Sequence, residues 1–276
     1  MNSACLYVVA TPIGNLEDIT LRALRVLAEA DIVAAEDTRH SRVLLSRHGI
    51  ERQLLALHEH NEDRTSPQLV ERILQGESLA LISDAGTPLL SDPGYRLVRM
   101  AAEAGIPVVP VPGASAVTAA LSVAGLPTDR FVFEGFLPPK AAARRKRLQA
   151  LAGEPRTLVF FESSHRIDGC LEDLEAALGE ERPAAVCREL TKRFETVLRG
   201  TLAELRGVVG SDPDQGKGEF VLVVGGSSTE SEDGLEQALA LARALREHVG
   251  ASQAARIAAS LHGVSRRDVY RMMGSE

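Results

Sequence analysis

Glu36, Asp37, Thr38 and Arg39 follow one another directly after the apolar run Ile32–Ala35. Carboxylates can act as general bases, and a guanidinium can hold a phosphate or a carboxylate. The same residues could also cap a helix and form a local ion pair, and this alternative stays open here. If the apolar run is a buried strand, its carboxyl end lies where active sites of α/β sheets occur.

The richest run of turn-forming residues is SDAGTPLLSDPG at 83–94, behind the apolar run Leu79–Ile82. Connections between a strand and a helix usually take about 2–6 residues, so this length favours a binding loop over a plain connection. Asp92 and Pro93 are typical of an N-cap and a first helical residue, and they predict a helix that Gly105 closes.

A second loop, PGAS at 112–115, follows the apolar run 106–111 and opens a helix of small residues that extends to 124. The free amides of a first helical turn can hold an anion or a carboxylate, although a plain turn is the alternative. Two such loops at the ends of adjacent parallel strands favour one shared ligand pocket.

Other sites receive less support from the sequence. His58, His60 and Glu62 alternate and could share one face as metal ligands, but an exposed polar strand end is favoured. The segment 210–217, GSDPDQGK, resembles a phosphate loop, yet it has one residue too many between its glycines and lacks the final Ser or Thr. We therefore expect no metal and no conventional nucleotide loop.

Two basic segments could contact phosphates. The alternative for the first is a solvated helix face, and the alternative for the second is a helical hairpin that only packs against its neighbours. Ser265 and Asp268 have the spacing of a capping box at the start of the last helix, after a short glycine-containing turn. The candidate cations are Lys140, Arg144, Arg145, Lys146 and Arg147 in the first segment and Arg256, Arg266, Arg267 and Arg271 in the second.

Composition limits the class of protein. The chain has 276 residues, 45% apolar residues and a net charge of −7, so it is expected to fold as a globular protein and to bind nucleic acid only through local patches. Aromatic residues make up 4%, with no Trp, which disfavours a base-stacking platform. Three cysteines without metal-like spacing fit a reducing cytoplasm, and no apolar run is long enough to span a membrane.

The apolar pattern predicts an α/β protein. Strands at 6–10, 32–35, 54–57, 79–82 and 106–111 alternate with helices, which indicates a mainly parallel sheet covered on both faces. One helix starts near Thr20 with Leu21, Leu24 and Leu27 on one face, and Ser66 with Pro67 is expected to cap another.

A second α/β unit is expected from 131 onward, and a small helical appendage after it. Its strands are expected at 131–136, 158–161, 184–187 and 220–224, and its helices near 140–152, 166–178 and 201–207. A polar linker at 225–234 precedes three short helices near 235–248, 251–260 and 265–273. We therefore expect domains at 1–116, 117–226 and 235–276.

Taken together, eight stretches resemble the tetrapyrrole-methylase superfamily, and within it the ribosomal RNA small subunit methyltransferase I branch. They are VATPIGNLEDIT (9–20), AAEDTRHS (34–41), HEHNE (58–62), LISDAGTPLLSDPG (81–94), VPGASAVTAALSVAGLP (111–127), FEGFLP (133–138), FFESSHR (160–166) and RELTKRFE (188–195). Relatives that methylate porphyrin-type rings usually open on G-x-G-x-G-D, where this chain has ATPIGNLED.

The resemblance implies two α/β domains with S-adenosylmethionine in the cleft between them. It also implies a homodimer and methylation of the ribose 2′-hydroxyl of a cytidine in the decoding region of 16S rRNA, within the 30S subunit. The cofactor residues that it implies are Ser83, Asp84, Ala85, Gly86, Thr87, Pro88, Leu89, Gly113, Ala114, Ser115, Ala116, Cys187, Gly218 and Glu219.

Glu36 and Asp37 are the candidate bases for this reaction, because a ribose hydroxyl must lose its proton as it attacks. Arg39 would position RNA phosphate, with Arg188 and Lys192 as partners from the second domain. Two alternatives remain at this stage: a tetrapyrrole methyltransferase of the same fold, and a non-enzymatic nucleic-acid binder that senses the cofactor.

Overall fold

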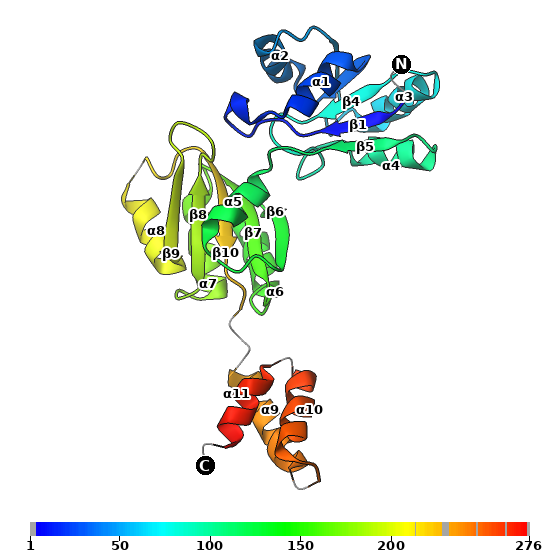
Figure 1. Ribbon diagram of the computed structural model, residues 1–276. Helices are drawn as coiled ribbons and strands as arrows, with labels where there is room; N and C mark the ends of the chain where they lie inside the picture. The colour runs from blue at the N-terminus through cyan, green and yellow to red at the C-terminus, as the bar shows by residue number, and fades with distance from the viewer. Residues whose placement is uncertain (1–3, 213, 228–231, 247, 263, 275–276) are drawn as a thin grey trace.

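The computed structural model describes residues 4–212, 214–227, 232–246, 248–262 and 264–274, which form two α/β units and a group of three helices (Figure 1). The first unit has five parallel strands in the order β3-β2-β4-β1-β5. Parallel strands place their carboxyl ends at one edge, so the loops that follow β1, β2, β4 and β5 meet there. The strands are β1 (Leu6–Val9), β2 (Ile32–Ala35), β3 (Gln53–Ala56), β4 (Leu79–Ile82) and β5 (Val108–Val111).

Helices cover both faces of this sheet, as expected from strands that are apolar on both sides. Helices α1 (Leu21–Glu29) and α2 (Thr38–Arg47) pack on one face, while α3 (Glu62–Leu74) and α4 (Tyr95–Glu103) pack on the other. A short 3-10 helix, Leu16–Asp18, lies between β1 and α1. The core therefore has two apolar layers, one on each side of the sheet.

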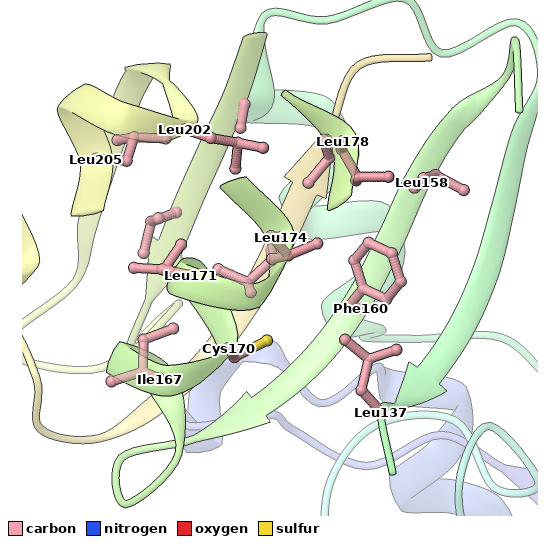
Figure 2. Close-up of a cluster of buried hydrophobic side chains, with 14 of the residues drawn as sticks. Leu137, Leu158, Phe160, Ile167, Cys170, Leu171, Leu174, Leu178, Leu202 and Leu205 are labelled. Atoms are coloured by element: carbon pink, nitrogen blue, oxygen red, sulfur yellow. The ribbon is translucent and has the colours of Figure 1, made fainter. Parts of the chain in front are cut away.

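The second unit has the strand order β6-β7-β10-β8-β9, with β6 and β7 parallel and the other neighbours antiparallel. Helix α5 (Ala116–Ala124) packs on one face and three helices pack on the other, where they bury the leucine-rich cluster of Figure 2. The strands are β6 (Phe131–Phe136), β7 (Thr157–Ser163), β8 (Pro183–Arg188), β9 (Thr196–Thr201) and β10 (Glu219–Val224), and the three helices are α6 (Ala141–Ala150), α7 (Ile167–Leu178) and α8 (Leu202–Ser211).

Helices α9 (Glu232–Leu245), α10 (Ala251–His262) and α11 (Arg266–Met273) pack against one another around buried alanines and Val269 (Figure 1). Helix α9 begins three residues before the expected start at 235, inside the expected linker 225–234. The remainder of that linker at 228–231 lies outside the described residues. Within the described ranges, no helix is both long and apolar enough to cross a membrane.

Three local predictions were wrong. Leu21 does not belong to the buried face of α1: it is 85% exposed, and Ala23, Val26 and Leu27 are buried in its place. Helix α3 begins at Glu62, a turn before the expected cap at Ser66, and contains Pro67. Strand β9 was not expected, because this edge strand has no buried residue and so lacks an apolar signal.

The start of α4 also differs from the prediction. Asp92 is not its N-cap, because the helix begins at Tyr95 with Gly94 as the cap residue. The first-turn amides of Gly94 and Arg96 donate to Glu62 Oε1 at 3.2 and 2.8 Å. Glu62 of α3 therefore replaces the local cap, which leaves Asp92 outside the helix.

Candidate functional site

Three loops at the carboxyl edge of the first sheet are joined by hydrogen bonds. Thr11 and Gly86 exchange backbone bonds of 2.8 and 3.1 Å, and Thr87 Oγ1 donates to the carbonyl of Ala114 at 3.1 Å. Gly86 has a φ of +81°, and a Cβ there would lie 3.2 Å from Ile13 Cγ2. These contacts hold the loops after β1, β4 and β5 as one platform.

The platform faces the second sheet across a cavity of about 420 Å³. This volume lies within the range of about 300–1,000 Å³ that is typical of small-molecule sites. The expected cofactor residues that line it are Asp84, Ala85, Gly86, Thr87, Ser115, Ala116, Cys187 and Glu219.

The other expected cofactor residues lie outside this lining. Ser83 lines a smaller neighbouring cavity, and Gly113 packs so closely on Ala10 that an added Cβ would lie 3.0 Å from it. Gly218 approaches Glu189 even more closely, because a Cβ added at Gly218 would lie 2.6 Å from Glu189 Cγ. Pro88, Leu89 and Ala114 belong to the same loops but are not part of the wall.

Three carboxylates gather on the first-sheet side of the larger cavity: Glu36, Asp84 and Asp92. Burial raises the pKa of Glu36, and the negative charge of Asp84 raises it further. Burial also raises the pKa of Asp92 to about 6, with Glu36 and Asp84 adding to the effect. Sequence reasoning missed Asp92 because its position before Pro93 resembles a helix start.

Asp92→Asn is expected to stabilise the protein above pH 6. A raised folded-state pKa means that the folded protein binds this proton more tightly than the unfolded chain, so the carboxylate form costs stability. At about 1.4 kcal/mol for each pKa unit, the free energy of unfolding should rise by about 1–3 kcal/mol at pH 7.5. Urea unfolding between pH 3.5 and 8 should show this gain fading from pH 6 downward and vanishing below pH 3.8, and a constant gain would contradict the assignment.

Asp37 forms the helix cap and the local ion pair that the sequence left open as an alternative to a base. Its carboxylate caps α2 by accepting from the amide of Arg39 at 2.8 Å, and it pairs with the Arg39 guanidinium at 3.1 Å. Hydrogen bonds from the Arg39 side chain lower the pKa of Asp37 to about 2. Such a weakly basic carboxylate is a poor proton acceptor, so the helix-cap alternative holds for Asp37. The Arg39 side chain is 92% exposed.

Lys192 is the cation that enters the cavity from the second domain. Its ammonium lies 2.9 Å from both Glu189 Oε1 and Glu219 Oε2. Burial alone lowers the pKa of Lys192, but these two hydrogen-bonded carboxylates outweigh it and raise the pKa overall. Arg188 lies nearby and donates to the carbonyls of Lys217 and Phe194 at 2.6 and 3.2 Å.

Cys187 and the other thiols take no visible part in chemistry. Burial raises the pKa of Cys187 to about 11, so its thiol stays protonated and forms an apolar part of the wall. Cys5 and Cys170 are buried in the cores of the two domains.

The basic segment on α6 is largely paired. Arg144 is buried and binds Asp173 at 2.6 Å, so the prediction of an exposed phosphate contact was wrong for this residue. Arg145 binds the other oxygen of Asp173 at 2.6 Å, and Arg147 binds Glu134 at 2.7 Å, but both side chains remain about half exposed. Lys140 is exposed just before the helix. The charged surface of α6 is therefore smaller than its sequence suggests.

Four non-glycine residues beside the cavity have left-handed backbone conformations. Leu89 and Ser91 have φ values of 75° and 72° in the loop after β4, and Glu189 and Thr191 have values of 51° and 65° after β8. Such conformations cost about 1–3 kcal/mol each and persist where the surroundings impose them. Strained backbone thus occurs in the segments that supply Ser91 to one wall of the cavity and Leu190 and Lys192 to the other.

The last two helices carry exposed arginines. Ser265 caps α11, as expected, by accepting from the amide of Asp268 at 3.4 Å. Arg266 donates to Ser252 Oγ at 2.8 Å and so joins α11 to α10, whereas the Arg267 side chain is exposed.

Comparison with known proteins identifies both parts of the chain. The family model of Tetrapyrrole (Corrin/Porphyrin) Methylases matches residues 5–206, and that of the RsmI C-terminal HTH domain matches residues 232–274. The solved structure of a uroporphyrin-III C-methyl transferase from Thermus thermophilus, complexed with S-adenyl homocysteine, is similar in fold, with a TM-score of 0.55. The match has 22% identity and covers 80% of this chain and 97% of that one.

Two curated relatives match nearly the whole chain. The Ribosomal RNA small subunit methyltransferase I of Xylella fastidiosa (strain Temecula1) is 55% identical over 265 residues, which cover 96% of this chain and 97% of that protein. The protein of the same name from Haemophilus influenzae is 51% identical over 267 residues, which cover 96% and 94%. The chain therefore belongs to the tetrapyrrole (corrin/porphyrin) methylase family, in the group of the ribosomal RNA small subunit methyltransferase I proteins.

Proposed function

We propose that this protein uses S-adenosylmethionine to methylate the ribose 2′-hydroxyl of a cytidine in the decoding region of 16S rRNA. The observation that carries the proposal is the acidic cavity between the two domains, in a chain at least 51% identical to two named rRNA small subunit methyltransferases. The substrate is RNA within the 30S subunit, and the sequence departs from the glycine-rich opening of ring methylases at 11–18.

The larger cavity suits S-adenosylmethionine, which has a cationic sulfonium and ammonium and an anionic carboxylate. The carboxylates of Asp84 and Asp92 favour the cationic groups. Ser115 makes no side-chain cap bond to the described residues at the start of α5, so the first-turn amides there can hold a carboxylate. Bound in this cavity, the cofactor would supply a methyl group on a positively charged sulfur, which is a strong electrophile.

Glu36 is the proposed general base. A carboxyl with a raised pKa accepts a proton better than an ordinary carboxylate, and the burial of Glu36 raises its pKa. The amide of Asp37 donates to Asp84 Oδ1 at 3.0 Å and so holds the second carboxylate in place beside Glu36. Glu36 would take the proton of the ribose hydroxyl as the oxygen forms its bond to the methyl carbon, while the bond from that carbon to sulfur would break and leave its electron pair on a neutral thioether.

Cations around the cavity and on the last helices would bind the RNA phosphates. Arg39 follows Glu36 and Asp37 along the chain, and its side chain is almost fully exposed. The other proposed contacts are Lys140, Arg145, Arg147, Arg188, Lys192, Arg266 and Arg267, with Arg144 removed from the expected set.

The double variant Arg266→Ala/Arg267→Ala is expected to weaken binding of the small subunit. Each lost phosphate contact should reduce the slope of log affinity against log salt by about 1, so the pair should reduce it by about 2. Filter binding at several salt concentrations measures this slope. The pair Arg22→Ala/Arg25→Ala removes the same charge from an exposed face of α1 and should leave the slope unchanged. Equal slopes for the two pairs would remove the last helices from the interface.

The direct test is transfer of tritiated methyl groups from S-adenosylmethionine to undermodified 30S subunits, with naked 16S rRNA alongside. Nuclease digestion of the product should locate the label on the 2′-oxygen of one cytidine. A uroporphyrin-like ring tests the tetrapyrrole alternative in the same assay. Label on the ring alone would overturn the proposal, and cofactor binding without any transfer would favour the sensor.

The proposed function also leads to expectations for the cellular location and the oligomeric state of the protein. We expect it to act in the cytoplasm, where ribosomal subunits are present and its three free thiols stay reduced. A homodimer remains a prediction, which sedimentation of the purified protein would check.

A further inference from the structure

A second, smaller cavity adjoins the larger one. Its volume is about 270 Å³, which lies just below the usual range of about 300–1,000 Å³ for small-molecule sites. Its walls come from the loop after β1, the 3-10 helix, the first turns of α2 and the loop after β4, with Lys192 and Glu219 added from the second unit. The aliphatic side chains in its lining are Pro12, Ile13, Leu16 and Leu44.

Ser41 places an unused hydrogen-bonding group in this wall. Ser41 is one of the residues that line the smaller cavity, and it is only 2% exposed. The Oγ atom has no hydrogen-bond partner among the described residues. A buried hydroxyl without a partner costs about 1–3 kcal/mol, so a polar ligand group that bonds to it would recover that cost.

The two cavities share part of their lining. Ile13, Asp84, Ala85, Lys192 and Glu219 contribute to both. A group held in the smaller cavity therefore lies next to a group held in the larger one. Transfer between two ligands requires this kind of adjacency, with the reacting atoms brought close together.

We propose that the smaller cavity binds the acceptor nucleoside, turned out of the RNA, with Ser41 Oγ bonding to a polar group of it. This assignment rests on the proposed function, which requires a nucleoside beside the cofactor. Enzymes that act on a single nucleotide commonly take it out of its stack and hold it between apolar side chains, with hydrogen bonds to its polar edge. The aliphatic residues of the lining and the unpaired hydroxyl of Ser41 supply these two kinds of contact.

Ser41→Ala is the first test, with Ser66→Ala as its matched control. Ser66 is also a fully buried helical serine whose Oγ has no partner in the described chain, but it lines neither cavity. Ser41→Ala should raise the KM for undermodified subunits about fivefold to tenfold, which corresponds to one lost hydrogen bond. The affinity for S-adenosylmethionine, measured by calorimetry, and the thermal midpoint should not fall. Ser66→Ala should leave all three quantities at wild-type values.

Leu16→Trp is the second test, because it fills the cavity from a position that is 38% exposed and so does not disturb the core. It should reduce both binding of the subunit in filter assays and methyl transfer by more than about tenfold, with cofactor affinity unchanged. If the wild type labels RNA and both variants behave like it, the acceptor assignment is overturned and the proposed function stands. If the wild type labels no RNA, the proposed function fails, and this assignment fails with it.

Discussion

Glu36→Gln is expected to lower the rate of methyl transfer by about 10²–10⁴-fold, the range attributed to a positioned general base. Glutamine keeps the size and polarity of the side chain but cannot accept the proton of the ribose hydroxyl. Because the change removes an interaction made only as the hydroxyl reacts, kcat should fall while the affinity for S-adenosylmethionine stays at its wild-type value. Single-turnover transfer to undermodified 30S subunits measures the rate, and calorimetry measures the affinity.

The neighbouring residue provides the control for this experiment. Asp37→Asn replaces the next carboxylate in the chain by an amide of the same length, as Glu36→Gln does. The carboxylate of Asp37, however, caps α2 and binds Arg39. Asparagine is also a good N-cap residue, so the protein should fold and transfer methyl groups at close to the wild-type rate. Comparable losses in both variants would show that the two acids act together, and no loss in either would move the base to Asp84 or Asp92.

Gly86→Val is expected to weaken binding of S-adenosylmethionine by at least about 100-fold. Gly86 has a φ of +81°, which a β-branched residue rarely adopts, and its Cβ would lie 3.2 Å from Ile13 Cγ2 and 3.7 Å from the carbonyl of Ala114. The valine must therefore displace the loops after β1 and β5 that form the cavity wall. Calorimetric titration with the cofactor measures the loss.

Gly153→Val controls for the general effect of replacing glycine by valine. A Cβ added at Gly153 would have no atom of the described residues within 4 Å beyond its chain neighbours, and the backbone there is not left-handed. This variant should therefore bind the cofactor normally. Circular dichroism and thermal melting establish that Gly86→Val is still folded. A folded Gly86→Val protein with wild-type affinity would exclude the loop at 83–94 from the cofactor site.

The fold could be predicted where apolar runs are long and continuous. Strands β2 and β4 have the boundaries expected from sequence, because buried central strands of a parallel sheet need apolar side chains on both faces. Strand β9 lies at the sheet edge, where mixed polar and apolar residues suffice, and it could not be recognised. The exposed position of Leu21 likewise depends on which neighbours the helix meets, which its own spacing does not determine.

The position of the cavity was easier to predict from the sequence than the contacts that individual side chains make there. The loops at 83–89 and 113–116 supply part of the cavity lining, and they could be predicted because glycine and proline mark where parallel strands end. The role of Asp92 was hidden because Glu62, thirty residues earlier in the chain, takes over the cap of α4. The pairing of Arg144 with Asp173 was hidden in the same way, since the acid lies on α7 and not on the basic helix. In both cases the role of a residue depends on a partner that lies far away in the sequence.

The left-handed residues Leu89, Ser91, Glu189 and Thr191 have a consequence for attempts to make a heat-resistant form of the enzyme. Glycine adopts these conformations without strain, so glycine at such positions is an attractive choice for relieving it. The same exchange would give more backbone freedom to the segments that supply Ser91, Leu190 and Lys192 to the cavity lining. Thermostability gained at these four positions should therefore come with slower turnover, and a more durable variant is better sought in the cores.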